Sequence, residues 1–184
     1  MSCYRLLAKN KTAGKTAKEM TMKKLFVVFL VLMLVPICAF AQQAAAAATA
    51  EVRYSVHMSN IGWGGFAVDG ETAGTTGQNR QIEAIRASVI SNVTGSIRYD
   101  VHVQNVGWLG WQFDNDIAGT TGRNLQVEAI RVQLSGQLAA RFDVRYRVHM
   151  SNQGWSGWSV NGEAAGTTGQ NRQLEAIEIR LVAK

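Results

Sequence analysis

Cysteine is almost missing from this 184-residue chain. Its two cysteines, Cys3 and Cys38, lie in an N-terminal segment that we expect to be removed from the mature protein. The remaining residues then contain no thiol, which excludes a disulfide framework and any cysteine-ligated metal. The mature chain must therefore be held together by packing, and residues 42–184 are enough to bury one hydrophobic core.

A run long enough to cross a membrane is missing as well. The main apolar run, residues 25–34, is shorter than the roughly 20 residues that a transmembrane helix needs. It follows Met-Lys-Lys at 22–24 and precedes Ala-Phe-Ala at 39–41, which is the order of a secretory signal and its cleavage site. We therefore predict a signal peptide over residues 22–41 and a secreted, extracellular mature chain, either free or associated with the cell surface.

Two short segments flank the predicted signal peptide. Residues 1–21 carry several lysines and no apolar periodicity, so they either lengthen the positive region of the signal or are not translated. Residues 42–50 are rich in alanine but too few to repay the cost of helix nucleation, and we predict a flexible linker there. Cys38 would suit a lipoprotein, but Ile37 stands where lipidation sites carry a small residue, so secretion without an anchor is favoured.

No excess of either charge survives the expected processing. The full chain has 19 lysines and arginines, 13 aspartates and glutamates, and a formal net charge of +6. Residues 1–41 hold seven of the bases and one of the acids, which leaves 12 of each in the mature chain. Because no basic stripe remains, we expect no nucleic-acid partner, and we expect no integral membrane segment in the mature chain.

One sequence pattern occurs three times in the mature chain. In its first copy Gly62-Trp63 is followed by Ala-Gly-Thr-Thr-Gly at 73–77 and by Glu-Ala-Ile at 83–85. The same blocks recur with their tryptophans at Trp108 and Trp155. Self-similarity at this period indicates one supersecondary unit that is repeated. We place the repeats at residues 51–94, 95–140 and 141–184.

Each copy has the pattern of a β unit. Apolar and polar side chains alternate strictly in residues 52–58, and residues 97–103 and 144–150 repeat this alternation, which is typical of a half-buried strand. A second strand is predicted from Trp63 to about Val68, followed by a corner of small residues. Last strands are predicted over residues 82–89, 127–134 and 174–181. No segment of the mature chain shows a helical pattern.

Three β units of this size predict an all-β fold. Repetition around an axis would remove the exposed sheet edges that single units would leave. We therefore expect one pseudo-threefold body built from three tandem repeats. A β-prism is favoured because three strands per copy make one small sheet each, and a β-trefoil is the alternative.

At this point the residues resemble a known family. Tyr-x-Val-His, Asn-x-Gly-Trp, a second aromatic three residues on, Ala-Gly-Thr-Thr-Gly and Glu-Ala-Ile resemble, in that order, the clostridial hydrophobic repeat with a conserved tryptophan, the ChW repeat. The resemblance covers residues 52–184 in three copies. It implies a module of secreted and surface proteins of Gram-positive bacteria, with a role in carbohydrate or surface interaction.

Two aromatic positions in each copy are candidate ligand contacts. A tryptophan at the first position also suits a core, since it buries about 150–250 Å². The second aromatic lies three residues on, so in a regular strand it faces the opposite side unless a glycine such as Gly65 introduces a bulge. An exposed second ring would offer apolar area to a sugar, and the alternative is packing between repeats. The candidates are Trp63, Trp108 and Trp155 at the first position, and Phe66, Trp111 and Trp158 at the second.

The first copy departs from the others at the second aromatic position. Phe66 stands where copies two and three carry Trp111 and Trp158. If this position stacks on a ligand, the first copy should bind most weakly.

Each copy also repeats one histidine, one turn asparagine and one glutamate. We expect the histidine ring to bond to the Asn-x-Gly turn or to contact ligand, and we disfavour a three-histidine zinc site because these strand faces look outward. The glutamate shares an alternation face with the inner residues, so its carboxylate needs the Thr-Thr-Gly corner or a tyrosine hydroxyl as a partner. These residues are His57, His102 and His149; Asn60, Asn105 and Asn152; and Glu83, Glu128 and Glu175.

These features favour a secreted, non-catalytic binding module. One repeated acid per copy does not supply the two carboxylates that a glycosidase needs, so no enzyme, metal or cofactor is expected. The predicted partner is a polysaccharide or glycan, bound through an aromatic-lined site in each copy. The alternative is a structural or adhesion module that contacts proteins at the bacterial cell surface.

Overall fold

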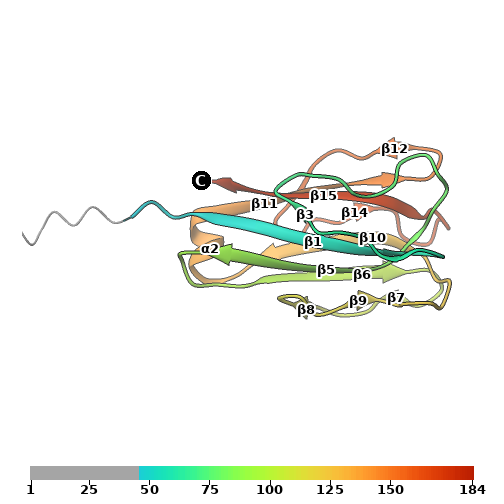
Figure 1. The fold of residues 1–184 in the computed structure, drawn as a ribbon, viewed down its shortest axis with the longest axis horizontal. Helices are drawn as coiled ribbons and strands as arrows, with labels where there is room; N and C mark the ends of the chain where they lie inside the picture. Colours follow the sequence, from blue (N-terminus) through green and yellow to red (C-terminus); the bar gives the residue numbers. More distant parts are fainter. Residues whose placement is uncertain (1–45) are drawn as a thin grey trace, which may run out of the picture. The chain divides into compact units, whose positions relative to one another are not determined.

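The computed structural model describes residues 46–184, of which residues 48–184 pack as one unit. Both cysteines and the predictions for residues 1–21 and 22–41 lie outside the described residues. The long strands of this unit run side by side along its length, and the short helix α2 (Gly136–Arg141) lies at the same end as the C-terminus (Figure 1). Among the described residues, none forms a helix long and apolar enough to cross a membrane.

Five strands form in each copy, two long and three short. The first copy contains β1 (Ala50–Met58), β2 (Gly62–Trp63), β3 (Ala67–Val68), β4 (Ala73–Gly74) and β5 (Ile82–Ser91). The second contains β6 (Ile97–Val103), β7 (Gly107–Trp108), β8 (Gln112–Phe113), β9 (Ala118–Gly119) and β10 (Val127–Leu134). The third contains β11 (Phe142–Met150), β12 (Gly154–Trp155), β13 (Ser159–Val160), β14 (Ala165–Gly166) and β15 (Leu174–Ala183). The all-β prediction is confirmed.

The three sheets exchange strands in a closed cycle. In each copy the two long strands pair antiparallel. The first two short strands pair with the free edge of the first long strand, as β2 and β3 do with β1. The fifth strand of every sheet comes from the next copy: β9 pairs with β5, β14 pairs with β10, and β4 pairs with β15. The last exchange joins the third copy to the first. The long edges of β5, β10 and β15 are therefore covered where the exchanged strands pair, which blocks edge-to-edge association there.

Glycine is required at the point of exchange. Gly119 has φ +120°, and a Cβ built there would lie 2.3 Å from the carbonyl oxygen of Glu83. Gly74 and Gly166 meet the neighbouring backbone at the same 2.3 Å. The Ala-Gly step in each copy thus allows one backbone to approach another more closely than any side chain permits.

The core is built from the inward faces of the long strands. Tyr54, Tyr99 and Tyr146 are fully buried, and their hydroxyls donate to backbone carbonyls of the hairpins that follow. Burial raises the pKa of Tyr54 and of Tyr99 to about 12. Apolar side chains from all three copies meet in the interior: Val56, Ile82, Ile85, Val101, Val127, Ile130, Leu174 and Ile177.

Three local expectations are corrected by the structure. The predicted second strand is interrupted, because residues 64–66 leave the sheet between β2 and β3. The connection at 135–141 contains α2, a helix of six residues that is too short to show a helical period in the sequence. The predicted linker ends earlier than residue 50, since β1 begins at Ala50 and Thr49 accepts a backbone hydrogen bond from Asn92.

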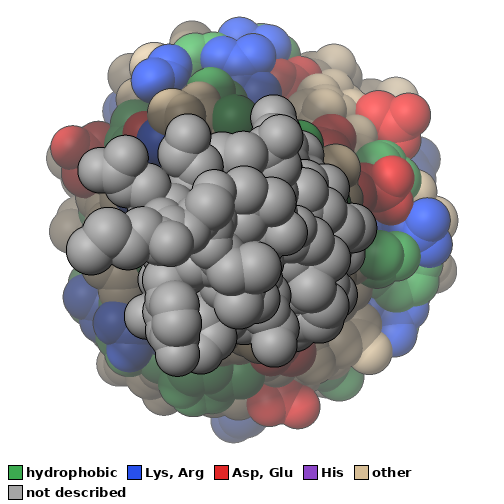
Figure 2. All heavy atoms as spheres, turned by 90° about the vertical axis from the view of Figure 1, so that its left-hand side faces the viewer, with side chains coloured by type: hydrophobic (Ala, Val, Ile, Leu, Met, Phe, Trp, Pro, Cys, Tyr) green, Lys and Arg blue, Asp and Glu red, His purple; other side chains and the backbone are tan. Residues whose placement is uncertain are grey.

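Charges of both signs are mixed over the surface. Around the rim that Figure 2 leaves visible, basic, acidic and apolar side chains alternate. This mixture agrees with the equal numbers of bases and acids in residues 42–184.

Candidate functional site

A β-bulge places one glutamate at each boundary between copies. In the β1–β5 pair His57 lies opposite Ala84 and Met58 lies opposite Ile82, so Glu83 has no partner of its own. The same shift leaves Glu128 and Glu175 unpaired in their sheets. A bulge re-aims a side chain relative to regular alternation. The glutamate is nevertheless buried, as expected: Glu83, Glu128 and Glu175 are 2%, 1% and 2% exposed.

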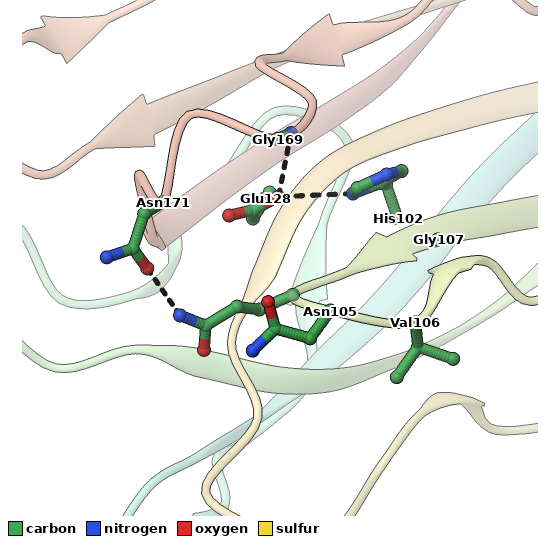
Figure 3. A pocket seen from close by; sticks show the side chains of 8 residues that line it. His102, Asn105, Val106, Gly107, Glu128, Gly169 and Asn171 are labelled. Atoms are coloured by element: carbon green, nitrogen blue, oxygen red, sulfur yellow. Dashed lines mark hydrogen bonds and ion pairs between the residues drawn. The ribbon is translucent and has the colours of Figure 1, made fainter.

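The buried carboxylate connects two copies. Glu128 is 1% exposed, and its Oε2 atom accepts a hydrogen bond of 3.1 Å from the backbone N–H of Gly169 in the third copy. The same oxygen lies 3.2 Å from Nδ1 of His102, as Figure 3 shows. Glu83 contacts Gly122 and His57 in the same way, and Glu175 contacts Gly77 and His149. The Thr-Thr-Gly corner supplies the partner, as expected, but from the next copy.

One expectation was that each histidine bonds to the Asn-x-Gly turn of its own copy. The structure does not show this bond. Each Nδ1 faces the glutamate carboxylate, and each ring meets the first tryptophan of its copy edge-on. The centroids of His57 and Trp63 are 5.5 Å apart with an interplanar angle of 79°. Because each histidine contacts its own glutamate, the structure does not bring the three rings together.

The two aromatics of each copy enclose an arginine. In the second copy the guanidinium carbon of Arg131 lies 4.6 Å from the Trp108 ring and 4.7 Å from the Trp111 ring. Arg86 takes this place in the first copy and Arg147 in the third. Both rings therefore lie on one face of the sheet, which the glycine-containing excursion at 64–66 and its counterparts make possible. Guanidinium groups over aromatic faces are attracted by the ring quadrupole.

The enclosed arginine comes from different strands in different copies. Arg131 on β10 lies opposite Asp100, and their ion pair measures 2.7 Å. In the third copy the acid and the arginine have changed strands. Arg147 lies on the first long strand, β11, and forms an ion pair of 2.6 Å with Glu178 on the last strand, β15. Sequence reasoning missed these arginines, since Arg86 and Arg131 occupy one repeat position but the third copy has Glu178 there and uses Arg147 instead. A search for cross-strand partners at one register would have found them.

The aromatic candidates are neither core residues nor open platforms. All three first-position tryptophans are half-buried, and so are Trp111 and Trp158. Phe66 is 51% exposed and is the most open of the six rings. The arginines cover part of the ring faces.

A polar groove lies next to the second buried glutamate. It has a volume of about 490 Å³ and is lined by His102, Asn105 and Glu128 from the second copy and by Gly169 and Asn171 from the third. In Figure 3 the side chains of Asn105 and Asn171 lie on one side of Glu128, and Val106 points away. A related groove of about 390 Å³ includes Asn152 of the third copy and Asn79 of the first.

Amide side chains link the copies around these grooves. Nε2 of Gln126 donates to Oδ1 of Asn171 at 3.1 Å, and Nε2 of Gln173 donates to Oδ1 of Asn79 at 3.0 Å. Gln81 makes the third such bond to Asn124 at 3.0 Å. Sequence reasoning missed this set, although an asparagine follows every Thr-Thr-Gly by two residues. The turn asparagines Asn60, Asn105 and Asn152, which it did select, all have φ near +60°.

Comparison with known proteins places these repeats. The sequence profile of Clostridial hydrophobic W (ChW) matches residues 57–90, 102–136 and 149–183, one match in each copy. The chain has no match among curated proteins or among solved structures. The three matches span more than half of the chain, and each begins in the first long strand of its copy. The chain therefore belongs to the Clostridial hydrophobic W family.

Proposed function

We propose that this protein is a secreted, non-catalytic module that binds polysaccharide in the grooves between its repeats. The observation that carries this proposal is the polar groove at the boundary of copies two and three, which has room for sugar-sized groups. Its lining offers amide donors and acceptors from Asn105 and Asn171 and a carboxylate from Glu128. A ligand rich in hydroxyl groups can exchange hydrogen bonds with the two amides, while the buried Glu128 holds the groove in shape through Gly169.

Because the unit is repeated, one molecule can carry more than one binding site for the polymer. Two of the three boundaries carry a groove, and the residues that form it recur at the third. Sites held on one rigid body can raise the avidity for a polymer by about 10² to 10⁴ over a single site. Weak individual contacts would then suffice for attachment to an insoluble polysaccharide.

The groove favours binding over catalysis. Glycoside hydrolysis uses two carboxylates on either side of the scissile bond. The groove lining contains one, Glu128, and its Oε2 atom is already engaged by Gly169 and His102. Binding without turnover fits this arrangement.

The proposal is tested by removing the turn amides while keeping the backbone. Asn60, Asn105 and Asn152 have φ between 60° and 61°, which glycine adopts without strain. The triple Asn→Gly variant should lose most of its retention on an insoluble polysaccharide panel and keep its circular-dichroism spectrum. Asn115→Gly is the control, because Asn115 has φ 74° in a hairpin turn and is not among the residues that line the grooves.

Two outcomes of this test would count against the proposal. If the wild-type protein is not retained on any polysaccharide, the function is wrong. If the triple variant and the Asn115→Gly control are retained as well as the wild type, the grooves are not the site.

A second candidate function rests on apolar side chains found only in the second copy. Leu109, Phe113 and Ile117 are 36%, 46% and 51% exposed. The first copy has Gly64 and Thr72 where Leu109 and Ile117 stand. The first copy exposes apolar side chains elsewhere, at Ile61, Phe66 and Ile90, and such groups favour contact with a protein. Replacing Phe113 by threonine should then abolish binding to a surface-protein partner and leave polysaccharide retention unchanged.

A further inference from the structure

Two arginines face each other across the outer face of the third sheet. Arg145 on β11 and Arg180 on β15 are direct partners in the antiparallel register. Like charges at such positions repel, because the Cβ atoms are only about 4.5–5.5 Å apart. Neither guanidinium makes a hydrogen bond or ion pair with another described residue, and Nε of each is buried without a partner.

The carboxylates around this pair are committed elsewhere. Glu178 holds Arg147 at 2.6 Å and accepts a hydrogen bond from Thr72. Asp143 contacts Nζ of Lys184 at 3.4 Å and accepts a hydrogen bond from an asparagine amide. Asp69 of the first copy accepts hydrogen bonds from two backbone N–H groups. Asp143 and Arg145 attract each other at longer range, but no carboxylate of residues 46–184 forms an ion pair with Arg145 or Arg180.

An aromatic ring orders one of the two guanidinium groups. The guanidinium carbon of Arg180 lies 4.0 Å from the Trp158 ring centroid, the shortest such distance among the described residues. The same ring contacts Arg147, which in turn contacts Trp155. Stacking lowers the number of rotamers that Arg180 samples and so reduces the entropy lost when its donors bind a ligand.

The other copies lack this arrangement. At the equivalent register Arg53 faces Ser88. Arg98 faces Gln133, whose Oε1 atom accepts hydrogen bonds of 3.1 Å and 2.6 Å from Nε and Nη2. In both of those copies one arginine has a neutral partner. The unneutralised pair is therefore a property of the third copy.

We propose that Arg145 and Arg180 form a subsite for the oxyanion of an acidic polysaccharide. Two guanidinium forks match the planar or tetrahedral oxygens of a carboxylate, sulfate or phosphate group, and the anion removes the repulsion between them. The subsite rests on the proposed function and names the class of sugar that the third copy selects. His149, which contacts the buried Glu175 at the boundary with the first copy, is four residues along β11 from Arg145, or about 13 Å, so one polymer chain can reach both the boundary and the arginine pair.

The experiment compares one polymer backbone in neutral, carboxymethylated and sulfated forms at a fixed low ionic strength. Arg180→Gln is the matched variant, because it recreates the Arg98–Gln133 pair of the second copy. The wild type should bind the two charged forms about tenfold more tightly than the neutral form, and Arg180→Gln should bind all three alike. Gln133→Arg, which builds a second arginine pair, should raise the preference for charged polymer. The carboxymethylated and sulfated arms show which oxyanion the pair accepts.

The outcomes separate this subsite from the function on which it rests. If the wild type binds only neutral polymer, or if Arg180→Gln keeps the preference for charged polymer, the subsite is wrong and the binding function stands. If no polymer binds, the function is wrong. The subsite survives that result only if inorganic sulfate raises the melting temperature of the wild type more than that of Arg180→Gln. Arg180→Gln should fold about as stably as the wild type, since removing a like-charge pair offsets the loss of the stacking on Trp158.

Discussion

Replacing Gly119 by alanine tests the strand exchange that closes the molecule. Gly119 lies in β9, which the second copy contributes to the sheet of the first. A Cβ atom at this position would lie 2.3 Å from the carbonyl oxygen of Glu83 and 2.6 Å from Cα of Ala84. Both are backbone atoms, so no rotamer change relieves the contact, and β9 must move away from β5.

The expected loss has two parts. A non-glycine residue at φ +120° costs about 1–3 kcal/mol. Moving β9 also weakens two hydrogen bonds, from Thr120 N–H to the Glu83 carbonyl at 2.8 Å and from Gly122 N–H to the Glu83 carboxylate at 2.9 Å. Such bonds contribute about 1 kcal/mol, and somewhat more when the acceptor is charged. We expect Gly119→Ala to lower the free energy of unfolding by about 4 kcal/mol, a large part of the 5–15 kcal/mol typical of a domain.

Gly122→Ala is the control for backbone strain. Gly122 has φ +66°, and a Cβ built there meets no atom within 4 Å, so this variant should lose only about 1 kcal/mol. Both free energies are measured by urea unfolding followed by tryptophan fluorescence and circular dichroism. A difference between the two variants of less than about 1 kcal/mol would refute the close approach.

The closed cycle adds a second check. Gly74→Ala perturbs the exchange between the first and third copies, which are farthest apart in sequence. Its cost should equal that of Gly119→Ala because the contact distance is the same. A harmless Gly74→Ala would mean that the cycle is open between the third and first copies.

Three further predictions concern the interior and the aromatic stacks. Glu128→Ala should cost about 3 kcal/mol in urea unfolding because it empties a buried site and removes the acceptor of the Gly169 N–H, and a cost below about 1 kcal/mol would contradict the bridging role. Burial raises the pKa of Tyr54 and Tyr99 to about 12, above the value near 10 of an exposed tyrosine. The folded state thus favours the neutral phenol, so their contribution to stability is complete below pH about 10 and is lost as the pH rises through 12; ultraviolet titration should show tyrosinate forming late and together with unfolding. Phe66→Trp should stabilise the protein by about 0.5 kcal/mol through extra stacking on Arg86 and so raise its melting temperature slightly, and an unchanged or lower melting temperature would argue against that stack.

Much of the fold follows from local sequence patterns. The alternation in residues 52–58 predicts β1, and its counterparts predict β6 and β11, because side chains in a strand point alternately to opposite faces. The threefold repetition predicts three related sheets. Only part of the candidate site could be predicted from the sequence. His102 and Asn105 were selected because they recur, and both line the groove, whereas Asn171 was not selected.

The errors arose where a residue depends on a partner in another copy. Regular alternation places Glu83 on the inner face, but the bulge opposite His57 turns its carboxylate toward the corner of the next copy. An odd separation places Trp63 and Phe66 on opposite faces unless a glycine interrupts the strand, and only the structure shows that both contact Arg86 on another strand. Neither outcome is encoded in the neighbouring residues.

The sequence by itself determined the strands, the number of copies and the family, because alternation and repetition are properties of short segments. Only the tertiary structure decided which copy completes which sheet, where the grooves lie and which arginines are left without an acid. The bond between Gly122 and Glu83 spans 39 residues, and the one between Ile179 and Tyr54 spans 125. Contacts at such separations depend on how the three copies close on one another, and no local pattern contains that information.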